Sequence, residues 1–326
     1  MTTAEKIRAK ALELGFTKVG IARADQLCEE AALLTEWLNR GYHATMDWMA
    51  RNYEKRIDPR TIIPDAKSVI SVALNYYTDI PHENAAGVGK ISRYAWGDDY
   101  HEIVHAKLGQ LWDWIRGQFP GAEGKCYVDT GPIMEKVWAE RSGIGWIGKH
   151  SNLITQEKGS WVFLGELITT LELEPDQPET DHCGTCTLCI EACPTGAIVE
   201  PYVVDSSRCI SYLTIEHRGP IGEEAAGSFD GWIYGCDICQ DVCPWNLKFA
   251  SSTAEQGFQP REWNRAPVLE EWKEMSEEEF KRKFRRSAMK RTKREGLVRN
   301  VKIGLETQSE GHGSVTTKSP TYEDRE

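Results

Sequence analysis

Two runs of cysteines carry the strongest chemical signal in this 326-residue chain. The first run, CGTCTLCIEACP at 183–194, has the C-x2-C-x2-C-x3-C-P spacing with which bacterial ferredoxins bind 4Fe-4S clusters. The second run ends in the same way, but twenty-six residues separate its first two cysteines. In such runs the fourth thiolate binds the neighbouring cluster. The spacing therefore predicts one cluster on Cys183, Cys186, Cys189 and Cys243 and a second on Cys193, Cys209, Cys236 and Cys239.

The alternative chemistry for these cysteines is a pair of zinc sites. Zinc modules usually pair two thiols, cross a long loop and then pair two more, and neither run has that spacing. Disulfides are not expected in a reducing cytosol. Iron-sulfur clusters transfer single electrons, and irons that are all bound by cysteine leave no position for a substrate. We therefore expect the reaction to take place in the large segment that precedes the cysteines.

The segment before residue 174 alternates between helical and strand-like patterns, which predicts an α/β unit with a central sheet. Apolar residues at helical spacing and short β-branched runs locate its elements. Helices are expected at 4–14, 26–41 and 101–119 and from Pro132 onwards, and strands at 18–22, 68–74, 126–130 and 161–169.

A polar, proline-containing linker at 174–182 separates this unit from the cysteines. Further on, Ser276 and Glu279 form a capping-box pattern that predicts the start of a helix. The end of the chain is rich in Ser, Thr, Gly and charge, which is typical of disorder. We predict an α+β protein with an α/β catalytic domain (1–173), a bacterial ferredoxin-like domain with two clusters (174–250), a short helical basic region (251–305) and a disordered tail (306–326).

Asp129 is the candidate catalytic residue of the N-terminal segment. It lies where a buried strand is expected to end, and such positions hold side chains rigidly while leaving them open to a ligand. The alternative is that Asp129 or Thr130 only caps a helix beginning near Pro132, and the pattern alone favours the cap. The chain has no G-x-G-x-x-G after a strand and no G-x-x-x-x-G-K-[ST]. His101 and His105 are expected at the surface or the edge of the core rather than as metal ligands.

The charge is unevenly distributed along the chain. The net charge is −11, yet residues 281–299 hold ten Lys or Arg against the single acid Glu295. Such a basic run favours contact with a polyanion, whereas the alternative is an ordinary solvated helix face. No apolar run has the length of a signal peptide or of a membrane span, so we predict a cytoplasmic, monomeric protein with no membrane contact.

Several short motifs surround the cysteine runs. They are EKR (54–56), SRYAWGDDYH (92–101), VDTGP (128–132), AERSGIGWIGKHSNLI (139–154), GSWVFLGE (159–166), RCISYLT (208–214) and YGCDICQDVCPWN (234–246). In this order they closely resemble the epoxyqueuosine reductases, over residues 1 to about 300. The resemblance implies an enzyme that reduces epoxyqueuosine to queuosine at the wobble position of tRNA anticodons. It also implies cobalamin, bound by the N-terminal domain and reduced to Co(I) by two 4Fe-4S clusters.

The resemblance also assigns roles to individual residues. Asp129 matches the proton donor of the family, and a donor near neutral pH needs a raised pKa, which the apolar face of the corrin would provide. The candidate cobalamin contacts are Arg56, Ser92, Asp129, Ile154, Ser211 and Asp237.

The partners implied are an external low-potential electron donor and tRNA. The candidate tRNA contacts within the basic run are Arg285, Arg286, Arg291 and Arg294. Many relatives continue into a helical HEAT-like repeat, and residues 288–305 resemble its start. We expect affinity or specificity for tRNA to differ where that repeat is shortened.

Two other functions compete with this interpretation. A cobalamin-dependent reductive dehalogenase would share the cofactors, but the chain shows no twin-arginine export signal, and a basic segment has no use with a small halocarbon. A non-enzymatic two-cluster electron carrier would not need a large α/β domain ahead of its clusters. Both features favour the tRNA reductase.

Overall fold

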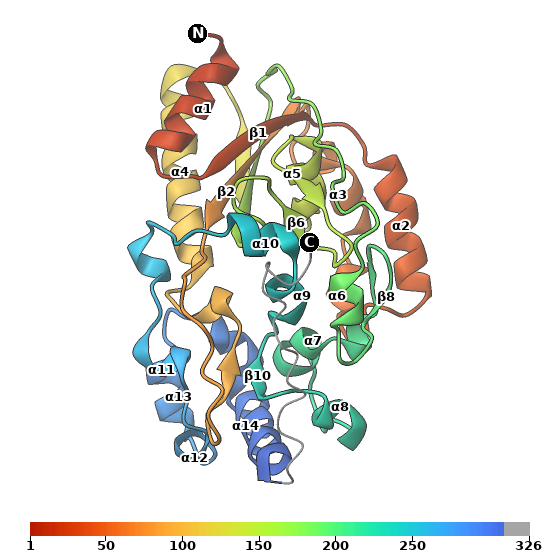
Figure 1. The fold of residues 1–326 in the computed structure, drawn as a ribbon. Helices are drawn as coiled ribbons and strands as arrows, with labels where there is room; N and C mark the ends of the chain where they lie inside the picture. The colour runs from red at the N-terminus through yellow and green to blue at the C-terminus, as the bar shows by residue number, and fades with distance from the viewer. Residues whose placement is uncertain (310–326) are drawn as a thin grey trace.

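A four-stranded antiparallel sheet organises the first half of the chain. The computed structural model describes residues 1–309, and the sheet lies in the upper half of Figure 1. Its strand order is β1-β2-β7-β4, and every neighbouring pair is antiparallel. The strands are β1 (Lys18–Arg23), β2 (Ser68–Asn75), β4 (Gly124–Tyr127) and β7 (Val162–Thr169). All four strands were expected, but β4 ends at Tyr127, before the predicted limit.

Helices cover both faces of this sheet. Strand side chains alternate between the two faces, so Ile70 and Val72 pack with the helices α1 and α4, whereas Val69 packs on the side of α5. Every residue of β2 is buried, as expected for a central strand covered on both faces. The helices of this half are α1 (Thr3–Glu13), α2 (Cys28–Asn39), α3 (Tyr53–Ile57), α4 (Tyr100–Gln118) and α5 (Glu135–Arg141).

A second core lies in the lower half of Figure 1. The short strand β3 (Lys90–Ile91) pairs in parallel with β10 (Trp232–Tyr234), and α14 (Lys293–Ser309) packs against β10. Residues of the N-terminal segment thus belong to a core that is built mainly from the end of the chain. The domain boundaries expected from the sequence remain a prediction. The short helices α11 (Glu262–Arg265), α12 (Leu269–Trp272) and α13 (Glu277–Lys283) complete this half.

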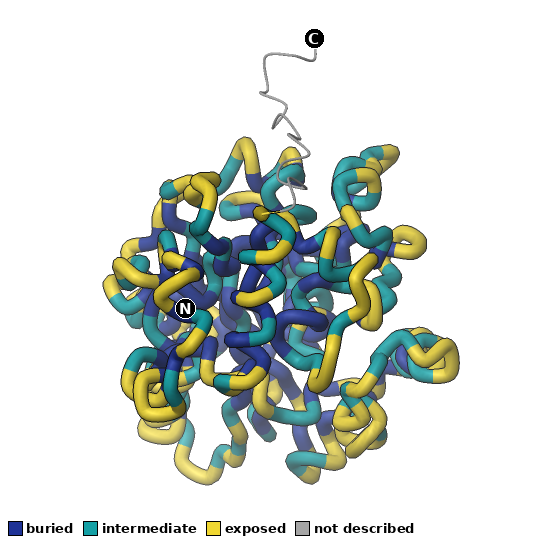
Figure 2. The backbone as a smooth tube through the Cα atoms, turned by 90° about the horizontal axis from the view of Figure 1, so that it is seen from below, coloured by how far each residue is buried: buried dark blue, intermediate teal, exposed yellow. Residues whose placement is uncertain are grey.

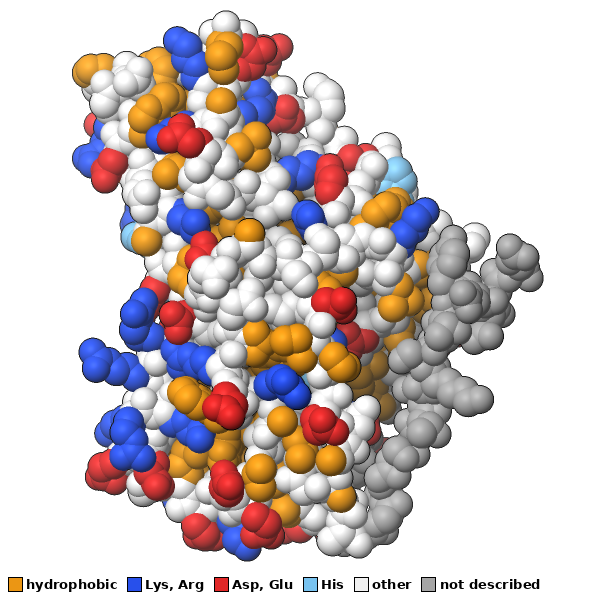
Figure 3. All heavy atoms as spheres, turned by 60° about the vertical axis from the view of Figure 1, so that its left-hand side comes forward, with side chains coloured by type: hydrophobic (Ala, Val, Ile, Leu, Met, Phe, Trp, Pro, Cys, Tyr) orange, Lys and Arg blue, Asp and Glu red, His pale blue; other side chains and the backbone are white. Residues whose placement is uncertain are grey.

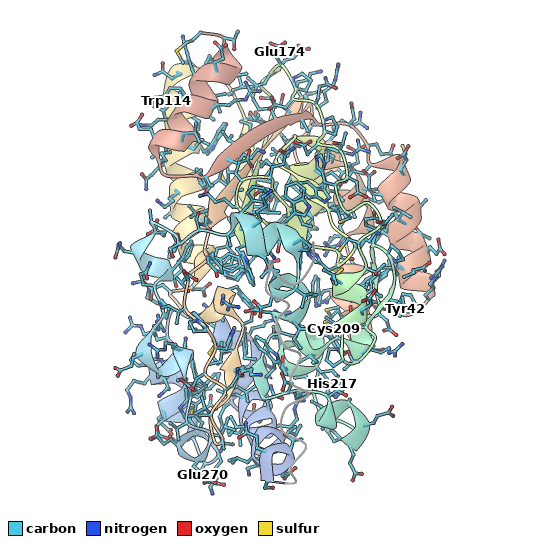
Figure 4. All side chains as sticks on the ribbon, in the orientation of Figure 1. Tyr42, Trp114, Glu174, Cys209, His217 and Glu270 are labelled. Carbon is cyan, nitrogen blue, oxygen red and sulfur yellow. The ribbon has the colours of Figure 1, made fainter. Side chains whose placement is uncertain are left out.

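The cysteine region lies between the two cores, where Figure 4 labels Cys209. Figure 2 shows that buried backbone runs through the middle of the molecule. Here α6 (Leu188–Glu191) packs against α9 (Ile238–Asp241), and each helix carries one cysteine. The remaining elements are α7 (Ile210–Ile215), α8 (Glu223–Gly227), α10 (Pro244–Phe249), the hairpin of β5 (Trp146–Ile147) and β6 (Leu153–Ile154), and the hairpin of β8 (Ile198–Glu200) and β9 (Val203–Val204).

The start of α5 corrects one expectation. The helix begins at Glu135, and its N-cap is Met134, whose side chain makes no capping hydrogen bond. Pro132 therefore lies outside the helix, and the hypothesis that Asp129 or Thr130 caps it is wrong. The physical reason is that the chain first makes a turn, in which Asp129 has a positive φ of 55°.

The end of the chain confirms one prediction and shifts another. Ser276 and Glu279 form the predicted capping box at the start of α13. The last helix continues to Ser309, four residues into the predicted disordered tail, and the rest of that tail lies outside the described residues. None of the helices within residues 1–309 is both long and apolar enough to cross a membrane.

Asn300 tests how the second core is held together. This residue of α14 is fully buried, and its Nδ2 donates to the carbonyls of Thr214 and Ile233 at 2.9 Å each. The variant N300A removes the donor of the Ile233 carbonyl and one of the two donors of the Thr214 carbonyl, which still accepts from the Thr292 hydroxyl at 2.9 Å. We therefore expect the free energy of unfolding to fall by about 1 to 3 kcal/mol in chemical denaturation. The exposed Lys302 on the same helix is the control, because K302A should cost less than about 1 kcal/mol. Equal losses in the two variants would contradict this account.

Candidate active site

Two adjoining cavities lie between the sheet and the cysteine region. The smaller measures about 550 Å³ and the larger about 1030 Å³, the size range of cofactor sites. The smaller is lined by β7 from above and by four cysteines from below, and the larger opens between α4 and the basic run. The residues that line both are Tyr94, Tyr100, Asp129, Val204, Cys209 and Ser211.

Asp129 stands in the wall that the two cavities share. Its side chain is 58% exposed, and that surface faces the cavities. The Tyr100 hydroxyl donates a hydrogen bond to Oδ2, and His101 Nε2 lies 3.5 Å from the same oxygen. Within residues 1–309 the other oxygen, Oδ1, has no hydrogen-bond partner. Oδ1 is therefore the oxygen that a ligand in the cavity can reach.

The partners of Asp129 are themselves held in place. The ring of Tyr100 stacks on Phe163 of β7, with centroids 4.2 Å apart and planes 4° apart. His101 Nδ1 lies 2.6 Å from Oδ1 of Asp99, which is 1% exposed and also pairs with Lys290 at 2.7 Å. The carboxylate of Asp99 thus fixes the orientation of the imidazole that faces Asp129.

These contacts determine the charges at the site. Burial alone would raise the pKa of Asp129, but hydrogen bonds from His101 and Tyr100 outweigh it and lower the pKa. Burial likewise opposes a charge on His101, yet its two carboxylate partners raise its pKa to about 9. The polypeptide by itself thus places an imidazolium against a carboxylate near neutral pH, and the raised pKa expected of Asp129 beside a bound corrin stays a prediction.

The cysteines form two adjoining groups. The pKa of Cys189 is raised to about 11 by burial and then by the charges of Cys243, Cys183 and Cys186. The other four line the smaller cavity together: Cys193, Cys209, Cys236 and Cys239. This grouping supports the predicted exchange of the fourth cysteine between the two runs. A 4Fe-4S cube binds each thiolate to a different iron, and within residues 1–309 no three such side chains converge on one metal position.

Lys149 supports the loop of the first cluster, a role that sequence reasoning missed. Its Nζ donates to the carbonyls of Gly184 and Cys186 at 2.6 and 2.9 Å. Lys149 is buried, although Lys is rarely buried without partners. Nothing in the motif GIGWIGKH predicts this role, because the contact joins Lys149 to a loop more than thirty residues further along the chain.

The candidate cobalamin contacts are only partly brought together. Ser211 lines both cavities, and Ser92 lines the smaller one while donating to the buried Asp237. Asp237 lies behind the wall, where it accepts from Arg93 N at 2.9 Å. Arg56 lines the larger cavity and is half-satisfied, because Nη2 donates to Trp48 O at 3.0 Å while Nε has no partner.

Ile154 differs from the other candidates. It packs with Trp146 and Cys243 beside Cys183, and it is not among the residues that line either cavity. The structure therefore places Ile154 nearest the first cysteine group.

The lining of the smaller cavity suits a large, mainly apolar ring that carries amide groups. Apolar side chains of Val162, Phe163 and Ile210 alternate with hydroxyl and amide groups of Ser92 and Asn152. Such a mixture is typical of cofactor pockets. The residues present therefore fit a corrin, and the cysteines of one group form part of the same wall.

The four candidate tRNA contacts have different surroundings. Arg291 lines the larger cavity and pairs with both oxygens of Glu216, at 2.7 and 2.8 Å. Arg286 pairs with Glu102 at 2.7 Å, and Arg294 is partly buried and donates to a carbonyl of the second core. Arg285 is exposed and makes no ion pair within the described residues. Figure 3 shows Lys and Arg side chains gathered along one edge of the lower half.

The site as a whole defines a redox enzyme, because two groups of cluster-binding cysteines adjoin a cavity that contains a hydrogen-bonded carboxylate. Curated epoxyqueuosine reductases from Cellulophaga algicola and Synechocystis sp. are 49% and 50% identical to the chain over 305 and 281 residues. These alignments cover 92% and 85% of this chain and 99% and 96% of the relatives. The chain belongs to the epoxyqueuosine reductase family.

Family models and solved structures agree with this assignment. Residues 182–246 match the model described as a 4Fe-4S double cluster binding domain, which confirms the two predicted clusters, and residues 56–130 match the model described as epoxyqueuosine reductase QueG. A solved epoxyqueuosine reductase with a modified tRNA-Tyr stem loop has a TM-score of 0.89 at 33% identity, covering 94% of this chain and 81% of that one. The enzyme from Streptococcus thermophilus has a TM-score of 0.86 at 33% identity, covering 94% and 82%.

Serine variants can test which cysteines share a cluster. C243S and C186S should remove the same cluster, although Cys243 belongs to the second run. Both cysteines lie close enough to Cys189 for their charges to raise the pKa of its thiol. C239S should instead resemble C193S. In each variant the iron content should fall from about eight to about four per chain, with the remaining cluster identified by its paramagnetic resonance spectrum after reduction. The exposed Cys28 is the control, since C28S should keep both clusters; a C243S spectrum that matches C239S would refute the exchange.

Proposed function

We propose that this chain reduces epoxyqueuosine in tRNA to queuosine, using electrons that pass from an external low-potential donor through the two clusters to a bound cobalamin. The observation that carries the proposal is the shared cavity wall, in which Asp129 and a complete group of four cysteines face the same space. Family membership supports the substrate, because a solved relative carries an epoxyqueuosine-modified stem loop of tRNA-Tyr. It also favours this activity over a dehalogenase or a simple electron carrier.

The reaction sets the demands on the site. Removing an epoxide oxygen as water, with an alkene left behind, consumes two electrons and two protons. Cobalamin, when bound, supplies the strongly reducing cobalt that delivers the electrons to an epoxide carbon. The side chains of the cavity must therefore bind and orient the substrate, exclude water and bring two protons to one oxygen atom.

Asp129 is the group placed to handle these protons. Tyr100 and His101 hold Oδ2, so Oδ1 points freely into the cavity. The pKa of Asp129 is low while the site holds no negative charge, since His101 favours the carboxylate. Negative charge that develops on the epoxide oxygen reverses this preference, because a nearby like charge raises the pKa of a carboxyl. The epoxyqueuosine reductase from Bacillus subtilis was solved with a catalytic loop, named after an aspartate, swung out of the active site.

The proposed cofactor contacts divide into two kinds. Ser92 and Ser211 present hydroxyls to the cavity, where they suit the amide side chains of a corrin. Arg56 keeps an unused N–H beside the larger cavity, and Asp237 orients Ser92 from behind. Ile154 would not touch the cofactor directly and would only support the cavity wall by packing against Cys243.

We propose that tRNA binds across the mouth of the larger cavity. Arg51 brings positive charge to this opening, Lys290 and Arg291 lie there already paired with Asp99 and Glu216, and Trp48 offers an aromatic face beside them. Phosphates would be bound by the cations and an unstacked base by the ring. Exposed Arg285 and Arg282 extend the same basic run outwards, whereas Arg294 is committed to the carbonyl of Met275.

Replacing Asp129 by asparagine tests the assigned role. D129N keeps the size of the side chain but cannot donate the proton, so we expect kcat with an epoxyqueuosine-containing stem loop to fall at least about 100-fold. The visible spectra of the clusters and of cobalamin should be unchanged. The exposed Asp113 on α4 is a matched control, and D113N should retain full activity. Normal turnover by D129N would exclude the role in proton transfer.

Charge reversal tests the proposed tRNA surface. The double variant R282E/R285E should weaken stem-loop binding about tenfold or more at low salt and reduce the dependence of affinity on salt concentration, because phosphate contacts are lost. Cofactor spectra should be unaffected. R116E makes the same change at an exposed site at the far end of α4 and should bind normally. Affinity and salt dependence equal to those of the unaltered chain would place the tRNA elsewhere.

A further inference from the structure

Two glutamates lie together beside Asp129: Glu166 is buried, and Glu135 is partly exposed and lines the smaller cavity. Glu135 is the first residue of α5, and its Oε1 accepts a hydrogen bond from the backbone N–H of Asp129. Glu166 lies on β7 and is 0% exposed. On this face of the sheet its register partners are Ser71 on β2 and Tyr127 on β4. The Glu135 and Glu166 carboxyl groups lie within hydrogen-bonding reach of each other, so that one could donate to the other if it carried a proton.

This contact requires a proton. Within residues 1–309 no donor of the protein reaches either oxygen of Glu166, and the nearby hydroxyl of Ser71 is also without a partner. Two ionised carboxylates could not form a hydrogen bond, and a buried unpaired carboxylate costs several kcal/mol. Burial, followed by the charge of Asp129, raises the pKa of Glu135 to about 8. Burial, followed by Glu135, raises the pKa of Glu166 well above its usual value.

The pair stands apart from the other proton carriers of the site. Tyr100 and His101 of α4 contact Oδ2 of Asp129 from one side, whereas Glu135 contacts its backbone from the other. Lys136, which follows Glu135, donates to the Ser151 carbonyl at 2.8 Å and, within residues 1–309, makes no ion pair with either glutamate, although its charge and that of His101 act on Glu135 from a distance. Apolar side chains of Val137 and Ile168 pack on the same face of the sheet, so bulk water has little access to Glu166.

We propose that the Glu135–Glu166 pair is the proton reservoir that restores the proton of Asp129 between the two protonations of one turnover. The inference rests on the proposed function, because only a reaction that brings two protons to one oxygen needs such a store. Asp129 is ionised at the start, so the first proton comes from the His101 imidazolium, which Asp129 passes to the oxygen as the first carbon–oxygen bond breaks. A proton of the pair then returns Asp129 to its acid form, and the second donation releases water as the other bond breaks.

Protons and electrons balance in this sequence. The external low-potential donor provides two electrons through the clusters, and Asp129 passes on two protons, of which His101 supplies the first and the pair the second. After one of its protons has left, the Glu135 carboxylate accepts the hydrogen bond of Glu166, which keeps the remaining negative charge shared. Solvent refills the pair once the product has left.

The pH dependence follows from the sign of the shift. The pKa of Glu135 is raised, so the reservoir is full below about pH 8 and empties as the pH rises through that value. We expect kcat of the holoenzyme to decline above pH 8. His101, with a pKa of about 9, loses its charge at still higher pH.

Two glutamine variants and an infrared titration test the proposal. E135Q retains an acceptor for the Asp129 N–H but holds no proton, so kcat should fall about 100-fold while KM changes little. In E166Q the amide donates to Glu135 and favours its charged form, so the alkaline decline of kcat should move down by one pH unit or more. In the holoenzyme, the carboxylic-acid C=O absorption of Glu135 should disappear between pH 7 and 9 while that of Glu166 remains, and E135Q should lack this step. E140Q, on the same helix but bonded to the Ile147 N–H, is the control and should match the unaltered chain in all three measurements.

The outcomes separate the reservoir from the function on which it rests. A holoenzyme that does not convert the modified stem loop overturns the proposed function, and the infrared titration then decides the reservoir alone. Conversion with an unchanged pH profile in both glutamine variants overturns the reservoir. So does the absence of a carboxylic-acid band that titrates near pH 8. If E166Q fails to fold, E135Q and the infrared titration still decide between these results.

Discussion

The buried carboxylate of Asp99 connects the parts of this molecule that its chemistry needs. Asp99 is the N-cap of α4, where it accepts from the His101 N–H at 3.2 Å, and its other contacts orient the imidazole and hold Lys290. Burial opposes its charge, but the hydrogen bonds of His101 and Lys290 outweigh this and lower its pKa. One carboxylate thus links the helix that begins beside the cavity, the partner of Asp129 and the basic run that follows α13.

The balance of charges around the cavity follows from this arrangement. His101 keeps Asp129 ionised, whereas at Glu135, only six residues along the chain, burial and the charge of Asp129 outweigh the charge of His101 and raise the pKa. Acid and base roles in enzymes commonly arise when environments push the pKa values of neighbouring groups apart. Here the separation is achieved by two helices, because α4 brings the imidazole and α5 brings the glutamate to opposite sides of one turn.

The basic run serves two purposes at once. Several of its cations are committed within the protein: Lys290 to Asp99, Arg291 to Glu216 and Arg294 to the Met275 carbonyl. These contacts attach the run to the cavity rim and to the second core. The exposed Arg282 and Arg285 are left facing outwards. A count of cations in the sequence overestimates the charge available to a polyanion, because it cannot show which cations are already paired.

The sequence by itself determined the redox class and most of the framework. Cysteine spacing predicts cluster chemistry because cluster ligands must follow at fixed short intervals, and the four strands follow from local apolar patterns. Only the tertiary structure decided what surrounds Asp129. Its cap role was wrong because α5 begins three residues later than Pro132 suggests. The hydrogen bonds of His101 and Tyr100, which lower its pKa in the polypeptide, could not be predicted from the local sequence. The pairing of Glu135 with Glu166 brings together a helix and a strand, and no local pattern reports such a contact, since it depends on how α5 packs on the sheet.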